Sequence, residues 1–452
     1  MRNLFNTIKN IFAIEDLRVR ILNTLGFLLV YRIGSYIVLP GVNPAELAAA
    51  HSGDQNGLMA LINVFAGGAF NRAAIFGLGI MPYISASIVM QLMGIAVPYF
   101  QKLQKEGTSG QKKIERYTRV LTVVVTAFQA PGYIASQIPE YAIIGGHATM
   151  FFYIRSVLML VAGTVFVMWL GEKITDKGVG NGISLIIMVG ILARLPFAFS
   201  AELIGNRMKS DGGGLIIFLV EIVFLVLVVM ATILLVQGTR KIPVQFAKRI
   251  VGNKQYGGAR QFIPLKVNAA GVMPIIFAQA IMFLPLTVFQ SLSGNSTTMT
   301  GLVATFSNIG GFWYNFTFGI MIVAFTYFYT AVIINSNQMA EEMKRNGGFV
   351  PGIKPGRKTA EYIDAVMSRI TLPGSIFLAI VAIMPAIAIL AKIDNGFARF
   401  YGGTSLLILV GVMMDTLQQI ESYLLMRHYD GLMKTGRIKG RTSLSGPGVA
   451  AA

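Results

Sequence analysis

The stretch that decides the fold is residues 65–98, FAGGAFNRAAIFGLGIMPYISASIVMQLMGIAVP. It begins with small residues around two adjacent glycines and carries one cation, Arg72. A long apolar run follows, broken by Pro82 and holding Ser85 and Ser87 in its middle. A segment that only crosses a bilayer has no use for such a beginning, whereas a segment that folds back into the membrane does. We therefore expect a re-entrant segment that leads into a kinked transmembrane helix.

The composition of the whole chain is that of a membrane protein with many spans. Its 452 residues are 54% hydrophobic and only 13% charged, whereas soluble domains are about one quarter charged. A helix needs roughly 20 apolar residues to cross the hydrocarbon core, and strand-like alternation typical of a β-barrel is absent. We expect an all-α protein with ten spans. They lie near residues 21–39, 74–97, 119–138, 152–170, 183–200, 214–236, 269–289, 313–334, 371–391 and 402–425.

The connecting loops alternate in charge. Residues 41–64 and 290–311 contain no lysine or arginine, while the loops on the other side are rich in both. By the positive-inside rule, both termini are cytoplasmic and the net charge of +18 lies mostly on one face. The basic, amphipathic residues 1–20 predict a cytoplasmic helix on the membrane surface, and residues 426–452 a basic cytoplasmic tail.

The ten predicted spans divide into two halves of five, residues 21–200 and 214–425, joined by an external hinge loop at 201–213. Because five is odd, the second half begins on the opposite side of the membrane from the first. The topology therefore allows two inverted repeats. The sequence similarity between the halves is too faint to establish them.

Two cytoplasmic loops, 237–266 and 335–370, are far longer than the topology requires. The first has seven cations and no acid, and its alternation predicts a two-stranded ribbon that projects from the membrane. The second has a tip rich in proline and glycine, followed by a predicted short helix. One reading is that these cations only set orientation and touch anionic lipid. The length of the loops favours docking of a large acidic partner, such as ribosomal RNA or a motor protein.

The sequence gives little support to catalysis or solute transport. It contains no cysteine, its three histidines are far apart, and no nucleotide-binding or zinc-protease motif occurs. We expect no enzyme activity, catalytic residue, cofactor or metal. A coupled carrier would place charged groups at the membrane midplane. The candidates are few: Glu221 in the sixth predicted span, Asp415 within the last span, and Glu421 near the cytoplasmic end of that span. An inverted-repeat secondary transporter of a small solute remains the disfavoured alternative.

The interior instead offers aliphatic residues next to helix breakers. A spacing of four residues places the pairs Ile80–Ile84 and Ile183–Ile187 each on one helix face. Ile276 follows Pro274, and Ile408 follows a run that begins with two glycines. Spacing alone does not show that these segments converge.

Seven segments at these places resemble signatures of the SecY/Sec61-alpha family, the channel subunits of the Sec protein translocase, in the family's order and spacing. They are YRIGSYIVLPG (31–41), GGAFNRAAIFGLGIMPYISASIVMQL (67–92), KEGTSGQKKIERYTR (105–119), MWLGEKITDKGVGNGIS (168–184), LKVNAAGVMP (265–274), FVPGIKPGRKTAEYID (349–364) and YGGTSLLI (401–408). The compact loops resemble those of bacterial members.

The resemblance implies an hourglass channel in the plasma membrane that translocates unfolded preproteins and releases hydrophobic segments laterally. A ring of aliphatic residues would form its waist, since such a constriction resists ions yet parts around a peptide. The ring maps onto Ile80, Ile84, Ile183, Ile187, Ile276 and Ile408. A plug helix maps onto residues 58–72, including Phe65, Gly67, Gly68 and Arg72. A lateral gate maps onto Ser85, Gln129 and Asn268.

The resemblance also implies partners. SecE and SecG would complete a heterotrimer, and the SecA ATPase or the ribosome would dock on the basic loops. SecD/SecF, YidC, signal peptides, nascent chains and membrane lipids would be further partners. Docking maps onto Lys248, Arg249, Lys254, Lys354 and Arg357. The family usually has arginine where this chain has Lys354, and lysine cannot form a bidentate contact.

Overall fold

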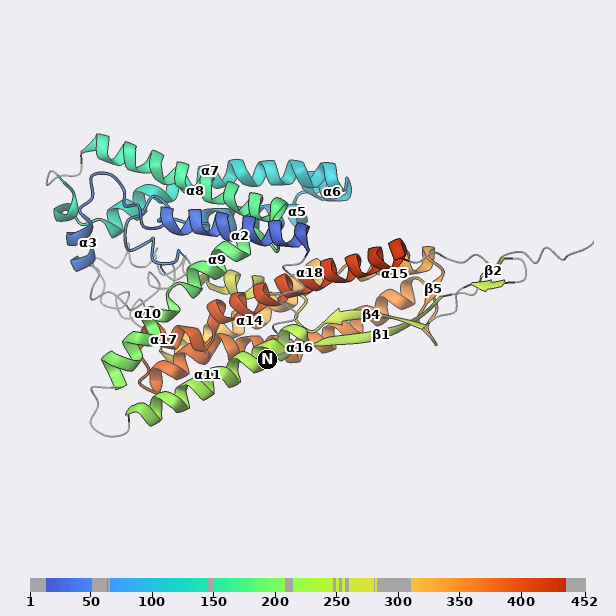
Figure 1. Ribbon diagram of the computed structural model, residues 1–452. Helices are drawn as coiled ribbons and strands as arrows, with labels where there is room; N and C mark the ends of the chain where they lie inside the picture. Colours follow the sequence, from blue (N-terminus) through green and yellow to red (C-terminus); the bar gives the residue numbers. More distant parts are fainter. Residues whose placement is uncertain are drawn as a thin grey trace, which may run out of the picture.

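The computed structural model describes residues 14–50, 63, 66–144, 149–207, 214–246, 249–251, 254–256, 260–279, 281–282 and 310–435. Helical elements dominate it (Figure 1). The first half contains α2 (Glu15–Gly34), α3 (Pro44–Ala50), α5 (Met81–Ala96), α6 (Pro98–Lys105), α7 (Thr108–Gln137), η1 (Glu140–Ala142), α8 (Met150–Lys177), α9 (Gly182–Leu192), α10 (Leu195–Ser200) and η2 (Ala201–Arg207). The second half contains α11 (Gly214–Gln237), β1 (Thr239–Phe246), β2 (Arg249–Val251), β3 (Lys254–Tyr256), β4 (Arg260–Lys266), α14 (Phe312–Ile333), α15 (Ser336–Arg345), β5 (Gly348–Phe349), α16 (Arg357–Leu390), α17 (Asn395–Ala398), η4 (Arg399–Tyr401) and α18 (Gly403–Thr435).

The helices form two groups that follow the two halves of the chain. Figure 1 shows α2, α5, α7 and α8 in one group and α11, α14, α16 and α18 in the other. Each group has its own buried cluster of apolar side chains. The two halves also meet, because α9 packs against α18. A third cluster, which draws on both halves, lies at this junction.

Within the described residues, six helices are long and apolar enough to cross a membrane, or seven if the bent pair α5–α6 counts as one span. The helices α2 and α7 overlap two more of the predicted spans. The remaining span, near residues 269–289, lies partly outside the described residues. The first span differs from its prediction, because α2 begins at Glu15 and ends at Gly34. Residues 15–20 therefore belong to this helix, and residues 1–13 lie outside the described part.

The prediction of one long kinked span over residues 74–97 is wrong at its start. Residues 74–80 form turns, and α5 begins only at Met81 with Pro82 in its first turn. Gly79 adopts a positive φ of 54°, which favours glycine and separates the turns from the helix. At its other end the chain bends by 102° between α5 and α6. Val97 is extended there because it precedes a proline.

Two connections are more helical than the sequence predicts. The predicted hinge loop begins with η2, a π-helix that continues from α10, while residues 208–213 lie outside the described part. The predicted short helix after the second loop is instead the start of α16, which runs unbroken for 34 residues. Pro373 and Pro385 lie inside α16, where tertiary packing of a long apolar helix outweighs the cost of proline.

The predicted ribbon is confirmed and belongs to a larger sheet. β1 pairs with β4 antiparallel from Thr239↔Lys266 to Gln245↔Arg260. β5, from the second long loop, pairs with the other edge of β1, giving the order β4-β1-β5. One buried cluster supports this sheet: Ile242, Val244, Leu265, Met343, Val350, Ile363 and Met367. The two long loops therefore form one structural unit that is anchored on α16.

Candidate functional site: a hydrophobic waist, a turn and a seam

The predicted ring isoleucines come together where three helices begin. Ile80, Ile187 and Ile408 are buried in one apolar cluster, and Ile84 and Ile183 pack against it. The sixth, Ile276, packs with Ile84 against a neighbouring cluster. Five of the six isoleucines therefore share one cluster. Ile84 also contacts the neighbouring cluster, against which Ile276 packs. We call these six residues the waist.

Local sequence explains how each helix presents its waist residues. The Ile84 N–H donates to the Ile80 carbonyl over 3.0 Å, so both lie on one face at the start of α5. The Asn181 side chain caps α9 by accepting from the N–H groups of Ile183 and Ser184 over 3.1 and 3.3 Å. Ile183 and Ile187 are thereby fixed in the first turns of α9.

Two glycines bring α8 and α9 into close contact next to the waist. A Cβ on Gly182 would collide with the Gly171 carbonyl oxygen, and a Cβ on Gly171 would lie 2.9 Å from Ile183 Cγ1. The Gly182 N–H also donates to the Thr175 hydroxyl over 2.9 Å. The position of Ile183 therefore depends on the absence of a side chain at both glycines.

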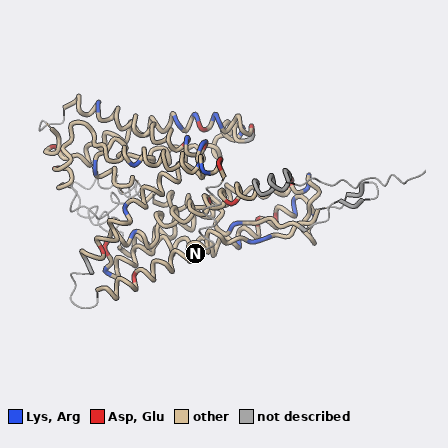
Figure 2. Tube along the Cα trace, viewed as in Figure 1, with Lys and Arg blue, Asp and Glu red and all other residues tan. Residues whose placement is uncertain are grey.

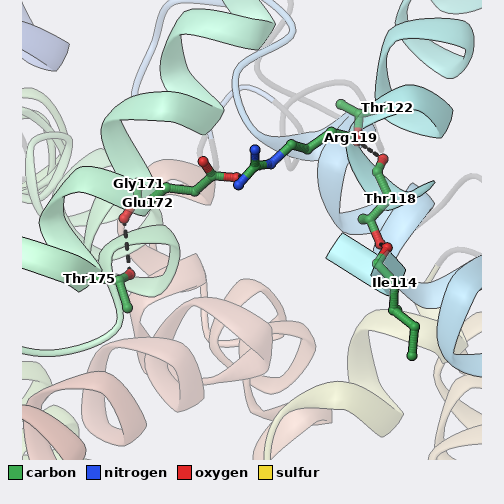
Figure 3. A network of polar contacts seen from close by, with 7 residues as sticks. All are labelled: Ile114, Thr118, Arg119, Thr122, Gly171, Glu172 and Thr175. Carbon is green, nitrogen blue, oxygen red and sulfur yellow. Dashed lines mark hydrogen bonds and ion pairs between the residues drawn. The ribbon is translucent and has the colours of Figure 1, made fainter. Parts of the chain in front are cut away.

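A polar network extends this support to α7. Arg119 and Glu172 form an ion pair of 2.7 Å between α7 and α8 (Figure 3). On the same helices, the hydroxyls of Thr118 and Thr122 donate to carbonyls one turn earlier, and that of Thr175 donates to Gly171. These bonds satisfy polar groups within the helices, as a membrane environment requires.

Sequence reasoning missed one residue beside the waist. Val272 packs against the waist cluster and also against the core of the second half. It lies four residues before Ile276, whose N–H donates to its carbonyl over 3.3 Å. The same four-residue spacing that indicated the other pairs could have found Val272.

Within the predicted plug, Asn63 is helical and residues 66–72 form turns, with positive φ angles at Gly67 and Gly68. Phe65 and residues 58–62 and 64 lie outside the described residues. The Tyr133 hydroxyl donates to the Phe70 carbonyl over 2.7 Å, and the two rings lie 4.8 Å apart. Arg32 of α2 donates to the Gly67 carbonyl over 2.9 Å. The turn is thus attached to both α2 and α7.

A seam between the halves runs beside the waist. Ile88 of α5 is buried together with Ala270, Phe277 and Tyr329 from the second half. Two oxygen atoms near this seam, Asn268 Oδ1 and the Tyr329 hydroxyl, are buried without a hydrogen-bond partner within the described structure.

The structure does not join the three predicted gate residues by hydrogen bonds. Ser85 donates to the Met81 carbonyl of its own helix over 3.2 Å, and Gln129 is exposed on α7. Asn268 is half-buried. Of these three residues, only Asn268 has a buried polar atom without a hydrogen-bond partner in the described structure.

The predicted docking residues that the structure describes lie in a separate two-stranded sheet, β2–β3, and at the start of α16. Arg249 and Lys254 are in β2 and β3, and Lys248 lies outside the described residues. Lys354 and Arg357 are exposed at the start of α16, where Arg357 pairs with Glu361 over 3.4 Å. Figure 2 shows Lys and Arg along β1 and β4 and at the end of α7 next to α6. These cations therefore lie at the same end of the molecule.

The three acidic residues considered as candidates for solute transport have different environments. Glu221 is buried on α11, and its carbonyl accepts from the Tyr401 hydroxyl over 2.9 Å. Asp415 and Glu421 are exposed on α18. Across the described ranges, no group of three or more His, Asp or Glu side chains could hold a metal ion.

In a membrane protein, a buried apolar cluster drawn from two helical halves, with a seam at its side, is the arrangement of a channel closed by a hydrophobic constriction. The SecY family model matches residues 74–417. The protein translocase subunit SecY of Chlamydia trachomatis serovar D is 39% identical over 458 residues, covering 96% of this chain and 99% of that relative. The chain belongs to the SecY family, and it is a protein-conducting channel. The transporter alternative is not favoured.

Solved structures agree on the fold. One described as a protein-conducting channel has a TM-score of 0.61 at 16% identity, covering 93% of this chain and 95% of its own. Sec61 in the canine ribosome–channel complex from the endoplasmic reticulum has a TM-score of 0.56 at 16% identity, with the same coverage. The predicted two-half channel fold is therefore confirmed.

Proposed function

We propose that unfolded preproteins pass through the waist, and that Ile80, Ile84, Ile183, Ile187, Ile276 and Ile408 form its seal. The convergence of these side chains from both halves carries the proposal. Aliphatic side chains exclude water and ions from a narrow opening, yet they make no directional bonds that would hold a passing peptide. Energy for transport would come from outside the chain, through SecA, the elongating ribosome or the membrane potential.

The turn at residues 66–72, together with the preceding residues from 58, would act as the plug, and the seam beside the waist would act as the lateral gate. Buried oxygens without partners, such as those of Asn268 and Tyr329, destabilise a closed contact. A seam that contains them separates more easily than a wholly apolar one. Ser85 and Gln129 would line the path once the halves part, so that sufficiently hydrophobic segments move into lipid.

The basic end of the molecule would face the cytoplasm of a bacterial cell, with both termini on that side of the plasma membrane. The concentration of cations on the sheet supports this orientation. SecA or the ribosome would dock there, and SecE and SecG would complete the complex. That a related Sec61 channel forms a complex with a ribosome supports a ribosome contact.

The test of the proposed function is reconstitution. The chain, purified with SecE and SecG and placed in vesicles with SecA, ATP and a preprotein, should give preprotein that is protected from added protease. Vesicles without the chain are the control. A preprotein that remains fully digestible in both would contradict the proposal.

Lys354 provides a test of docking. Its side chain is exposed and has no ion-pair partner in the described part of the chain. Charge reversal by Lys354→Glu should lower the apparent affinity for SecA by roughly tenfold, since about 1.4 kcal/mol of interaction corresponds to that factor. Lys354→Arg should keep or strengthen binding. The measurement is preprotein translocation at limiting SecA concentration.

Lys392→Glu is a matched control, because Lys392 is also exposed and basic but follows the last residues of α16, at the opposite end of that helix from Lys354. If Lys354→Glu translocates like the unaltered protein, this tip does not take part in docking.

A further inference from the structure

Three arginines from different segments meet at the turn that follows residue 65. Arg32 comes from α2, Arg72 from the turn itself and Arg194 from the junction of α9 and α10. A Cβ placed on Gly68 would lie 3.6 Å from Arg72 Nη2 and 3.8 Å from Arg194 Nε. A Cβ on Gly67 would lie 3.2 Å from Arg32 Nη1. The three guanidinium groups therefore surround two adjacent glycines that have no side chains.

Ion pairs do not neutralise these cations within the described part of the chain. No described carboxylate lies within ion-pair distance of Arg32, Arg72 or Arg194. Arg32 and Arg72 lie over the Tyr36 ring, at 4.9 and 4.1 Å from its centroid. The Arg72 Nη1 atom is buried and has no hydrogen-bond partner in the described structure. A strong donor is therefore unused beside two other positive charges.

A fourth arginine adds to the positive field. Arg399 of η4 is buried, and it lies near enough to Arg194 for their charges to interact. Burial, and to a lesser degree the charge of Arg194, lower the pKa of Arg399 to about 10, while Asp394 opposes this shift. Arg399 is still protonated at neutral pH. Like charges in a poorly solvated interior repel strongly, so a negative charge beside Arg72 and Arg194 would stabilise the arrangement.

We propose that the space beside Gly68, between the guanidinium groups of Arg72 and Arg194, binds a small inorganic anion. Guanidinium groups recognise oxoanions through paired N–H donors, and they also attract halide ions. Gly68 carries no side chain that would occupy the space next to the guanidinium groups of Arg72 and Arg194.

The bound anion would hold the turn in its resting position. Gly67 lies against α9, because a Cβ there would be 3.0 Å from Gly190 Cα. An anion bound between Arg72 of the turn and Arg194 at the end of α9 would remove the repulsion between these two side chains. It would thereby strengthen the contact between the turn and α9. This role in holding the turn rests on the proposed function of the turn as part of the plug.

The binding test uses the full chain in its purified complex. Thermal unfolding is followed in sodium gluconate while chloride or sulfate replaces gluconate at constant ionic strength. We expect a saturable rise in Tm on the order of 2 °C for at least one of these anions. The comparison of chloride with sulfate distinguishes a halide from an oxoanion.

Arg72→Gln and Arg194→Gln should abolish the rise, whereas Arg116→Gln, at an exposed position on α7, should preserve it. Arg194→Lys keeps the charge, so it should retain a weaker rise even if the glutamine variants fold poorly. A rise of equal size in all variants would be a general salt effect, and it would overturn the site. So would the absence of any saturable rise.

The role in holding the turn is tested by chemical labelling. Because the chain has no cysteine, Asn71→Cys introduces a single thiol next to Arg72. In reconstituted vesicles, the anion that raises Tm should slow labelling by a maleimide by a factor of two or more. An unchanged labelling rate alongside a saturable Tm rise would overturn this role of the anion. Preprotein translocation by the same vesicles tests the channel function separately.

Discussion

Replacing both Ile187 and Ile408 with asparagine should raise the resting ion leak of the channel by about tenfold or more. Both side chains are buried in the waist cluster, at 6% and 4% exposure. Each amide would enter an apolar site without a partner, which costs about 1–3 kcal/mol and favours entry of water. The closed waist would therefore be both less stable and more hydrated. The measurement is ion efflux from vesicles that contain the complex but no preprotein.

The matched control replaces the same two residues with leucine. Leucine keeps the apolar character and nearly the same volume, so the leak should remain close to that of the unaltered channel. If the asparagine variant leaked no more than the leucine variant, the seal would have to lie elsewhere than at these isoleucines.

Gly182→Ala should be strongly destabilising, by about 3 kcal/mol. The added methyl group would collide with the backbone oxygen of Gly171 and lie 2.7 Å from Ile174 Cβ. Backbone atoms cannot rotate away as a flexible side chain can, so α8 and α9 must separate. Since Ile183 follows directly, the waist should also be disturbed. The expected result is a lower Tm of the purified complex and a reduced amount in membranes.

Gly26→Ala is the control for this substitution. Gly26 lies within α2, and a Cβ there would meet no atom within 4 Å. Alanine has a higher helix propensity than glycine, so this variant should be neutral or slightly more stable. Equal Tm values for the two alanine variants would contradict the close packing of α8 on α9.

Local patterns in the sequence predicted much of this structure. Apolar runs predicted the helices, and the alternation at residues 241–247 predicted the ribbon. The waist pairs followed from four-residue spacing together with nearby helix breakers. These signals succeed because they depend on neighbours along the chain. The resemblance to the SecY family was needed to bring the separate isoleucines into one ring.

Features that depend on distant contacts could not be predicted in the same way. β5 has only two residues, and it forms because β1 offers an open edge. Residues 74–80 have the apolar composition of a span, but they form turns, and the backbone on either side of Ala74 pairs with Ile37 and Leu39. The arginine cluster joins residues 32, 72 and 194, which no sequence spacing relates. In each case, contacts between segments that are distant in the sequence determine the structure, and local sequence patterns do not reveal them.

The most direct test of the account is to find out which residues touch a protein chain during its transport. A photo-reactive amino acid would be placed at Ile187 or Ile408 in the waist, or at Leu219, which is 61% exposed on α11. A preprotein is then arrested midway across the membrane and the sample is illuminated. The account predicts cross-links to the arrested chain from Ile187 and Ile408 but not from Leu219. Failure of both waist positions to capture the chain would contradict the claim that proteins pass through the waist.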